Sequence, residues 1–434
     1  MSKEQKLIPA IRFPDFKNEE EWDIEELGLL SEIVRGGSPR PIEDYFTNDV
    51  NGLNWLKIAD VPSDSKYILQ TKEKVKKEAL SSTREVNPGD LILSNSMSFG
   101  RPYILKITTC IHDGWIAIRK ISYRTFEDYL YYFISSESSQ SYFQTNAAGA
   151  AVKNLNAEII KLLPIYLPKN KKEQQKITTC LSSLDEVIAV HSQKLDLLKN
   201  HKKGLMQNLF PQEGEKVPKY RFKEFEKDGE WVEKTLNDTA DKKIKWSFTG
   251  GPFGSNLMAS DYTANGFRII QLQNIGDGVF NDDNKIYASI EKADELLSCN
   301  IYAGDIIISK MGDPVGRACV IPNTLHRCIM ASDGIRLVVD ETKYSKYFIY
   351  SLINSKRIRE AIKKKATGST RKRIGLDILR ETELIIPKSP KEQQKIASCF
   401  SSLDALITAQ AEKIEQLKLH KKGLMQGLFP KIEI

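Results

Sequence analysis

Residues 168–211 read PKNKKEQQKITTCLSSLDEVIAVHSQKLDLLKNHKKGLMQNLFP, and residues 387–430 read PKSPKEQQKIASCFSSLDALITAQAEKIEQLKLHKKGLMQGLFP. Aligned without a gap, 27 of the 44 positions are identical, which chance does not explain. Because internal similarity of this kind is the mark of a repeated structural unit, the chain is predicted to contain two copies of one unit.

Shorter matches flank both copies in the same order. Arg12, Phe13 and Trp22 recur as Arg221, Phe222 and Trp231, residues 89–94 (GDLILS) recur as residues 304–309 (GDIIIS), Gly100 and Arg101 recur as Gly316 and Arg317, and Gly149 recurs as Gly368. The offset drifts from 209 to 219 residues, which indicates insertions between the copies. We therefore predict a first arm at 1–167, a central spacer helix at 168–211, a second arm at 212–386 and a C-terminal spacer helix at 387–434.

Each repeat has the pattern of a long helix with a coiled-coil seam, because apolar residues recur at alternating steps of four and three. The residues expected to pair are Ile177, Leu184, His191 and Leu198 in the first copy and Ile396, Leu403, Gln410 and Leu417 in the second. If the helices pair along their length, the polar side chains His191 and Gln410 meet and fix the register. Antiparallel pairing would place the arms at opposite ends of a spacer; the alternative is two long core helices in independent domains.

The start of each helix carries a capping signal. Ser389 and Glu392, with Pro390 between them, form the spacing of a capping box with proline at the first helical position, and Asn170 with Glu173 is the counterpart. We therefore expect both helices to begin next to these residues.

Composition supports an ordinary multidomain globular protein. A chain of 434 residues is too long for one hydrophobic core, and 41% hydrophobic with 28% charged residues is typical of globular chains. The six cysteines do not cluster with the five histidines, so no metal site is expected. No apolar run reaches the length of a bilayer span, and the expected location is cytoplasmic, with no membrane partner. The net charge of +7 permits an anionic partner.

The arms are predicted to consist of mixed strands and short helices. In the second arm the pattern predicts strands at 267–272, 305–309 and 335–339, and one helix at 345–365. The expected fold class is α+β, with two such arms, two long helices pairing as an antiparallel coiled coil, and a pseudo-twofold internal repeat.

The loops of the arms supply the candidate DNA-binding residues. Glycine permits close backbone approach, and arginine can bind guanine edges or phosphates. The candidates in the first arm are Arg35, Ser38, Arg40, Ser96, Arg101, Lys153 and Asn154, and those in the second are Ser255, Lys310, Arg317, Ser369, Thr370, Arg371, Lys372 and Arg373. The glycine-rich turns at 35–40 and 249–255 lack the ending of a nucleotide-binding loop, so their backbone N–H groups are predicted to contact DNA phosphates.

Motifs for catalysis are missing. The sequence has no Asn-Pro-Pro-Tyr loop of an adenine methyltransferase, no P-loop of a translocase, and no convincing acidic cluster of a nuclease. We therefore expect no catalytic residues in this chain and assign any chemistry to partners.

The two QQKI helices, the GDIIIS segment and the TGSTRKRI loop at 367–374 together resemble the specificity subunit of type I restriction-modification systems, over essentially the whole chain. The resemblance implies a subunit that reads an asymmetric two-part site on double-stranded DNA, one half per arm, with the helices fixing the unread spacer. It further implies two methyltransferase subunits that modify adenine at N6 and two restriction/translocase subunits. S-adenosylmethionine, ATP and Mg²⁺ would then be bound by those partners, with no cofactor in this chain.

Two functions of other classes remain open from the sequence. One is a free-standing restriction and methylation polypeptide, against which the missing methyltransferase motifs argue. The other is a coiled-coil scaffold that binds only proteins, which a salt-insensitive or absent DNA affinity would favour. A methylation-only system without a motor subunit is a further variant of the first reading.

Overall fold

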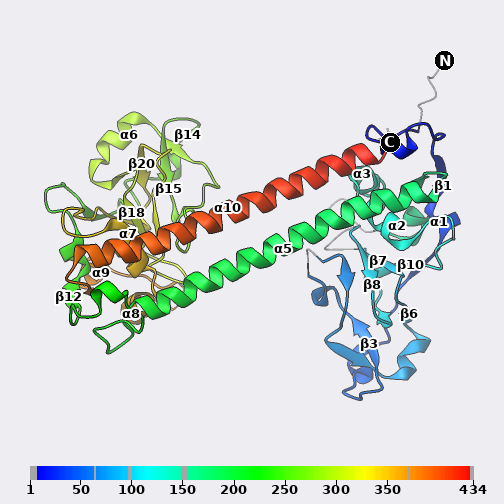
Figure 1. Ribbon diagram of the computed structural model, residues 1–434, viewed down its shortest axis with the longest axis horizontal. Coiled ribbons are helices and arrows are strands. Elements are labelled where there is room, and N and C mark those ends of the chain that lie inside the picture. Colours follow the sequence, from blue (N-terminus) through cyan, green and yellow to red (C-terminus); the bar gives the residue numbers. More distant parts are fainter. Residues whose placement is uncertain (1–6, 63–64, 96–99, 148–154, 370, 431–434) are drawn as a thin grey trace. The chain divides into compact units, whose positions relative to one another are not determined.

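The computed structural model describes residues 7–62, 65–95, 100–147, 155–369 and 371–430. The chain divides into two compact units: the first is Met1–Ser192 with Glu412–Ile434, and the second is Gln193–Ala411. Two long helices, α5 (Lys171–Leu209) and α10 (Pro390–Leu428), pass from one unit to the other (Figure 1). Each unit therefore contains one arm and a part of both helices.

The first unit has a five-stranded sheet in the order β2-β10-β7-β8-β4, a four-stranded sheet in the order β5-β3-β9-β6, and the pair β1-β11. Its strands are β1 (Asp23–Glu26), β2 (Glu32–Arg35), β3 (Leu53–Leu56), β4 (Tyr67–Ile68), β5 (Glu73–Val75), β6 (Arg84–Val86), β7 (Leu91–Ser94), β8 (Pro102–Leu105), β9 (Thr109–Ile111), β10 (Trp115–Arg119) and β11 (Pro164–Leu167). Its shorter helices are α1 (Leu27–Leu30), α2 (Glu127–Ile134), α3 (Glu137–Asn146) and α4 (Ala157–Lys161).

The second unit has a four-stranded sheet in the order β13-β21-β18-β19, a five-stranded sheet in the order β14-β16-β15-β20-β17, and the pair β12-β22. Its strands are β12 (Val232–Thr235), β13 (Phe248–Gly250), β14 (Tyr262–Thr263), β15 (Phe267–Ile270), β16 (Tyr287–Ala288), β17 (Asn300–Tyr302), β18 (Ile306–Ser309), β19 (Ala318–Val320), β20 (Arg327–Met330), β21 (Gly334–Leu337) and β22 (Glu383–Ile386). Its shorter helices are α6 (Ile290–Glu295), α7 (Lys346–Ile353), α8 (Lys356–Lys365) and α9 (Leu376–Arg380).

The two units repeat the same sheet topology. The order β2-β10-β7-β8 corresponds to β13-β21-β18-β19, and β5-β3-β9-β6 corresponds to β16-β15-β20-β17. Each unit also contains a parallel pair in the second of these sheets, with Trp55 opposite Cys110 in β3-β9 and Arg268 opposite Cys328 in β15-β20. The predicted α+β fold with an internal repeat and two long helices is confirmed.

The repeated Gly-Asp of the GDLILS and GDIIIS segments forms the turn that starts β7 and β18. Gly89 and Gly304 have φ values of +91° and +83°, a left-handed conformation that favours glycine. The carboxylate of Asp90 accepts a hydrogen bond from the Asn87 N–H at 2.8 Å, and that of Asp305 accepts from the Tyr302 N–H at 2.9 Å. The motif is thus explained by turn geometry and not by contact with a ligand.

The single helix predicted at 345–365 is wrong, because the segment is broken into α7 and α8. The side chain of Asn354 exchanges two hydrogen bonds with the backbone of Ala318 in β19, at 3.1 and 3.0 Å. Ser355 has extended backbone angles, φ −66° and ψ 152°, and precedes a new helix. The two bonds from Asn354 to β19 fix the backbone between α7 and α8, and a separate helix begins after Ser355. Two predicted strands are shorter than expected. The strand predicted at 267–272 ends at Ile270, and the strand predicted at 335–339 is β21, Gly334–Leu337.

Both hydrophobic cores are built jointly by an arm and the ends of the two long helices. In the second unit, Phe210 of the segment after α5 stacks on Phe400 of α10, with ring centroids 5.5 Å apart, and meets Phe348 of α7 edge-on. In the first unit, Phe429 after α10 packs edge-on against Phe133 of α2. An arm therefore cannot complete its core without both helices.

The repeated arginines, Arg12 and Arg221, are explained by a buried ion pair at the start of each long helix. Arg12 donates two hydrogen bonds to Glu173 at 2.7 and 2.8 Å, and Arg221 donates two to Glu392, both at 2.8 Å. In both pairs the side chains are at most 7% exposed. The predicted capping boxes are therefore wrong in the donors to the glutamates: the carboxylates accept from distant arginines and not from the cap N–H groups, because a bidentate charged pair is stronger than one bond to an amide.

A second pair of equivalent contacts joins the long helices to each other. Lys421 of α10 donates to Asp185 of α5 in the first unit, and Lys202 of α5 donates to Asp404 of α10 in the second. From Asp185 to Lys202 the contact moves 17 residues forward along α5, and from Lys421 to Asp404 it moves 17 residues back along α10. The helices pair in antiparallel fashion, as predicted, and an equivalent lysine–aspartate contact joins them in each unit.

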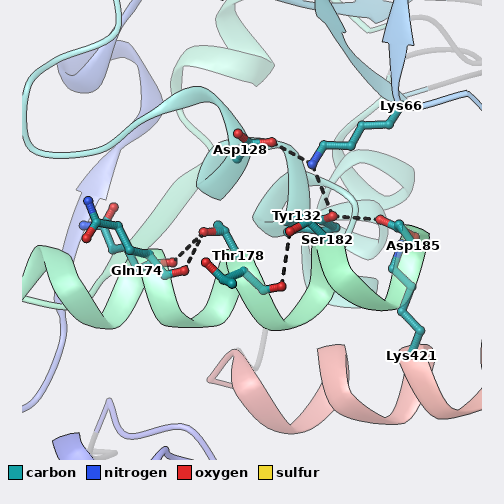
Figure 2. Close-up of polar contacts among 10 residues, drawn as sticks. Lys66, Asp128, Tyr132, Gln174, Thr178, Ser182, Asp185 and Lys421 are labelled. Atoms are coloured by element: carbon teal, nitrogen blue, oxygen red, sulfur yellow. Dashed lines mark hydrogen bonds and ion pairs between the residues drawn. The ribbon is translucent and has the colours of Figure 1, made fainter. Parts of the chain in front are cut away.

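The same aspartates also bind the arms. Figure 2 shows Asp185 between Lys421 and the hydroxyl of Tyr132, which donates to the carboxylate at 2.7 Å and accepts from Lys66 at 3.2 Å. In the second unit the Tyr347 hydroxyl donates to Asp404. Burial, with the neighbouring carboxylate, raises the pKa of both tyrosine hydroxyls far above the ordinary value, so both stay protonated and donate.

The predicted seam is buried to different degrees. Ile177, Ile396, Leu403 and Gln410 are buried, and Leu184, His191, Leu198 and Leu417 are half-buried. His191 and Gln410 belong to different units, so their meeting stays a prediction. In the described part of the chain, no helix combines the length and apolar character needed to span a membrane.

Candidate nucleic-acid interface

Each arm brings its glycine-rich turn against a second turn with the sequence Asp-Gly. In the first arm, the N–H groups of Gly36 and Gly37 donate to the carbonyls of Trp115 and Ile111, which flank the turn of Asp113 and Gly114. In the second arm, the N–H of Gly251 donates to the carbonyl of Gly334 at 2.8 Å. These three donors are used internally, so the predicted role for them, contact with DNA phosphates, is wrong.

The close approach of these turns explains why glycine is required. A Cβ on Gly36 would lie 2.1 Å from the carbonyl oxygen of His112, and a Cβ on Gly251 would lie 1.9 Å from that of Ala331. Both distances are far below van der Waals contact. The glycines thus bring the neighbouring side chains of the turn to the Asp-Gly turn.

Asp113 organises the candidate residues of the first arm. Its carbonyl accepts from Arg35 Nε at 3.0 Å, and its carboxylate accepts from the hydroxyl of Ser38 at 3.1 Å. Arg40, 86% exposed, lies 3.9 Å from the same carboxylate, and Asn95 Nδ2 donates to the Asp113 carbonyl at 3.0 Å. The predicted residues Arg35, Ser38 and Arg40 are therefore brought together around an aspartate that the sequence analysis missed.

Beside these residues lies a largely apolar cavity of about 910 Å³. Ser38 and Arg40 line it together with Phe46, Trp55 and His112. Nδ1 of His112 accepts a hydrogen bond from the Gly114 N–H at 2.8 Å, and burial lowers the His112 pKa, so the ring is neutral at physiological pH. The cavity thus has an aromatic wall, with the hydroxyl of Ser38 and the guanidinium of Arg40 at its edge.

The second arm has a smaller and more polar cavity at the equivalent place, of about 210 Å³. Phe253 of the glycine-rich turn, Gln271, Gln273 and Asp333 line it. The predicted contact Ser255 follows two residues after Phe253 and is exposed. Its hydroxyl lies 3.4 Å from Asn256 Oδ1. The two arms therefore place different side chains on the same backbone frame.

The loop that follows β18 is joined to both the Asp-Gly turn and the loop at 367–373. The N–H of Lys310 donates to the Asp333 carbonyl at 2.7 Å, and the Ile374 N–H donates to the Lys310 carbonyl at 2.9 Å. Thr367 and Arg373 exchange two backbone hydrogen bonds, and the Gly312 N–H donates to the Lys372 carbonyl. The candidates Lys310, Lys372 and Arg373 are thus brought together.

The remaining candidates of this loop differ in exposure. Ser369, Arg371 and Arg373 are exposed, and Lys310 and Lys372 are half-buried. Arg317 is half-buried under the loop, where its Nη2 lies 3.6 Å from the place a Cβ on Gly312 would occupy. The exposed arginines are free to reach a ligand, whereas Arg317 lies at the base of the loop.

The first arm repeats these connections with fewer described side chains. Asn95, the counterpart of Lys310, donates its N–H to the Gly114 carbonyl at 3.0 Å, and its own carbonyl accepts from Leu155 at 3.3 Å. Arg101 lies over the ring of Tyr103, 5.4 Å from the centroid. The predicted contacts Ser96, Lys153, Asn154 and Thr370 lie outside the described residues.

One signal in the sequence pointed to the missed centre of the site. Each arm has an Asp-Gly pair in the turn before the strand that follows the parallel pair, Asp113-Gly114 before β10 and Asp333-Gly334 at the start of β21. The two pairs are shifted by one residue in register, since the Asn95 N–H donates to the Gly114 carbonyl and the Lys310 N–H donates to the Asp333 carbonyl. Among the described residues, no group of three or more His, Cys, Asp and Glu side chains could hold a metal ion.

Comparison with known proteins agrees with the duplicated geometry. Residues 19–200 and 229–419 each match the type I restriction modification DNA specificity domain. The MjaVIII specificity subunit of a type I restriction enzyme from Methanocaldococcus jannaschii is 21% identical over 94% of this chain and 92% of its own length.

Two solved structures share the fold. The crystal structure of the type I restriction-modification S subunit from M. genitalium has a TM-score of 0.57 at 15% identity, over 98% of this chain and 100% of that one. A structure described in a study of complex assembly and conformational transition of the type I R-M system also has a TM-score of 0.57, at 17% identity, over 94% and 97%. With both repeats matched, the chain belongs to the family of type I restriction-modification DNA specificity subunits.

Proposed function

We propose that this subunit reads an asymmetric, two-part DNA site, with one half bound by each arm and the paired helices setting the unread spacer between them. The observation that carries the proposal is the pair of equivalent clefts, which have the same backbone connections and different side chains. Sequence is read by side chains at base edges, so one frame with two side-chain sets suits two different half-sites.

We propose further that the chain performs no chemistry itself and directs partner subunits. Two methyltransferase subunits would methylate adenine at N6 in the two halves, and two restriction/translocase subunits would cleave unmodified DNA with ATP. The methyl donor S-adenosylmethionine, ATP and Mg²⁺ would be bound by those partners. The support is the family to which the chain belongs.

The test is single-molecule methylation sequencing of DNA from cells that express this chain with its cognate methyltransferase subunit. We expect one bipartite motif with N6-methyladenine in both halves. A continuous motif would contradict the two-arm arrangement. Absence of methylation from an assembled complex would favour a protein-binding scaffold.

The half-sites can be assigned to the arms with three substitutions, of which Arg317→Ala and Arg101→Ala are a matched pair. Arg371→Ala in the second arm should weaken methylation of one half-site, since loss of a base contact costs about 1–3 kcal/mol. Arg317→Ala should weaken the same half-site by disturbing the base of the loop. Arg101→Ala, at the position equivalent to Arg317, should affect only the other half. Methylation rates on duplexes altered in one half at a time measure this, and equal effects on both halves would refute the assignment.

A further inference from the structure

The second unit contains a groove between the C-terminal part of α5 and the helices α7 and α8, with a volume of about 690 Å³. Figure 1 shows α8 beside the end of α5, and Arg357 of α8 donates to the carbonyl of Pro211, just after that end. Seven lysine and arginine side chains and only two carboxylates line the groove. Its surface is therefore strongly basic.

Several of these cations have no acidic partner. Among the described residues, no carboxylate forms an ion pair with Lys199 or Lys203 of α5, or with Lys363 of α8. Arg357 donates to the backbone carbonyls of Pro211 and Glu215. Cations gathered without counter-charges repel one another, so a bound anion would stabilise the groove.

The start of α8 adds amide donors to the same place. Ser355, which precedes this ten-residue helix and lines the groove, is 3% exposed, and its hydroxyl has no hydrogen-bond partner among the described residues. Its counterpart Ser136, ahead of α3, accepts a bond from the Ser139 N–H. The first turn of α8 thus lacks the side-chain cap that α3 has, and uncapped N–H groups favour an anion.

The first unit does not share this charge. The ten residues of α3 read ESSQSYFQTN, whereas those of α8 read KRIREAIKKK. In the first unit, Gln426 of α10 bonds Glu137 at the position equivalent to Lys356. The long helices carry the same lysines in both copies, so the difference comes from the arm.

The groove is continuous with the loop predicted to read DNA. Pro314 of that loop lines the groove, and the loop packs on α8, since a Cβ on Gly316 would lie 2.8 Å from Ile362. The guanidinium groups of Arg317 and Arg359 are close enough that the charge of Arg317 lowers the pKa of Arg359, to which burial contributes most. A duplex held by the loop would pass its backbone along this groove.

We propose that this groove binds phosphates of the DNA backbone next to the half-site read by the second arm, and that the first unit has no equivalent contact. The proposal rests on the proposed function, because it places the duplex on the reading loop. Phosphate contacts of this kind give affinity and orientation without sequence preference. The second arm should therefore supply most of the salt-sensitive binding of the subunit.

The test compares two matched double substitutions in the full-length chain. Lys199→Gln with Lys203→Gln removes two groove lysines, and Lys418→Gln with Lys422→Gln removes their exposed equivalents on α10. Binding of a random-sequence duplex is followed by fluorescence anisotropy over a range of KCl concentrations. Since each phosphate contact contributes about 0.9 to the slope of log K against log salt, the groove variant should have a slope shallower by about 2, and the control should match the unsubstituted chain.

Each outcome separates the two proposals. Equal slopes for the groove variant and the unsubstituted chain, or equal losses in both variants, would overturn the groove assignment while leaving the proposed function intact. An unsubstituted chain without salt-dependent DNA binding would overturn the proposed function itself. If the groove variant instead lost a methyltransferase subunit with its slope unchanged, the groove would be a protein-docking site and the proposal wrong.

Discussion

Replacing Glu392 with alanine will destabilise the second unit by about 3–5 kcal/mol, because it leaves Arg221 buried without a counter-charge. The carboxylate accepts two hydrogen bonds from Arg221 and one from Trp231 Nε1 at 3.2 Å, and it is 1% exposed. Hydrogen exchange of core amides in each unit measures the loss, since a chain of two units does not have a single unfolding free energy.

The matched controls for this substitution lie in the same chain. Glu224→Ala removes an ion pair with Lys395 whose side chains are both about half-exposed, and should change stability far less than Glu392→Ala, because solvent screens an exposed pair. Glu173→Ala should lower the stability of the first unit by no more than Glu392→Ala lowers that of the second. Trp231 donates a hydrogen bond to Glu392, whereas the indole N–H of its counterpart Trp22 has no partner among the described residues. A loss under about 1 kcal/mol for Glu392→Ala would show that the pair does not hold the arm to its helix.

Replacing Phe210 with alanine will also cost the second unit about 3–5 kcal/mol, the usual result of emptying a buried aromatic site. Phe210 is 1% exposed and its ring contacts both Phe400 and Phe348. Because it joins the end of α5 to α10 and to α7, its loss should loosen the attachment of the arm to both helices. Urea unfolding of the second unit, followed by hydrogen exchange, measures the effect.

Two further substitutions show how large this loss of stability is relative to a milder change and to an exposed position. Phe210→Leu keeps most of the buried volume and should cost clearly less than the alanine variant, since the shape changes but little cavity forms. Leu197→Ala, at a position 69% exposed on the same helix, should have almost no effect. If methylation of one half-site fell with Phe210→Ala while the other half kept its rate, the arm and the helix junction would be coupled in function as well as in folding.

The long helices and the duplication could be predicted because they depend on local periodicity. Ile177, Ile396 and their neighbours recur at heptad spacing, which a sequence displays directly. The break between α7 and α8 could not be predicted in this way, because the apolar pattern runs through Asn354 and the interruption is caused by its bonds to Ala318 in a separate strand.

The partners of Glu173 and Glu392 were missed for the same reason. Their spacing from Asn170 and Ser389 is that of a capping box, whereas their actual partners Arg12 and Arg221 lie 161 and 171 residues away. The recurrence of these arginines was visible in the sequence, but nothing in it joined them to the helices.

The candidate site was predicted as separate loops and not as an assembly. Arg35, Ser38 and Arg40 stood out because they surround a glycine pair, yet the aspartate that gathers them, Asp113, belongs to an Asp-Gly pair of the kind found in many turns. The role given to the N–H groups of Gly36, Gly37 and Gly251 was wrong because a sequence does not show which donors are already used.

The tyrosine contacts of Asp185 and Asp404 have a consequence for how new specificities can arise. Tyr132 is the sixth residue of α2 and Tyr347 is the second residue of α7, so the two hydroxyls reach equivalent carboxylates from positions one helical turn apart. The helices thus offer the same attachment site to each arm, and this site accepts a tyrosine from more than one position of the arm's helix. An exchanged arm needs an apolar face that packs on both helices, an arginine for the helix start and a hydroxyl within one turn of the aspartate, and its reading loops can vary without redesign of the spacer.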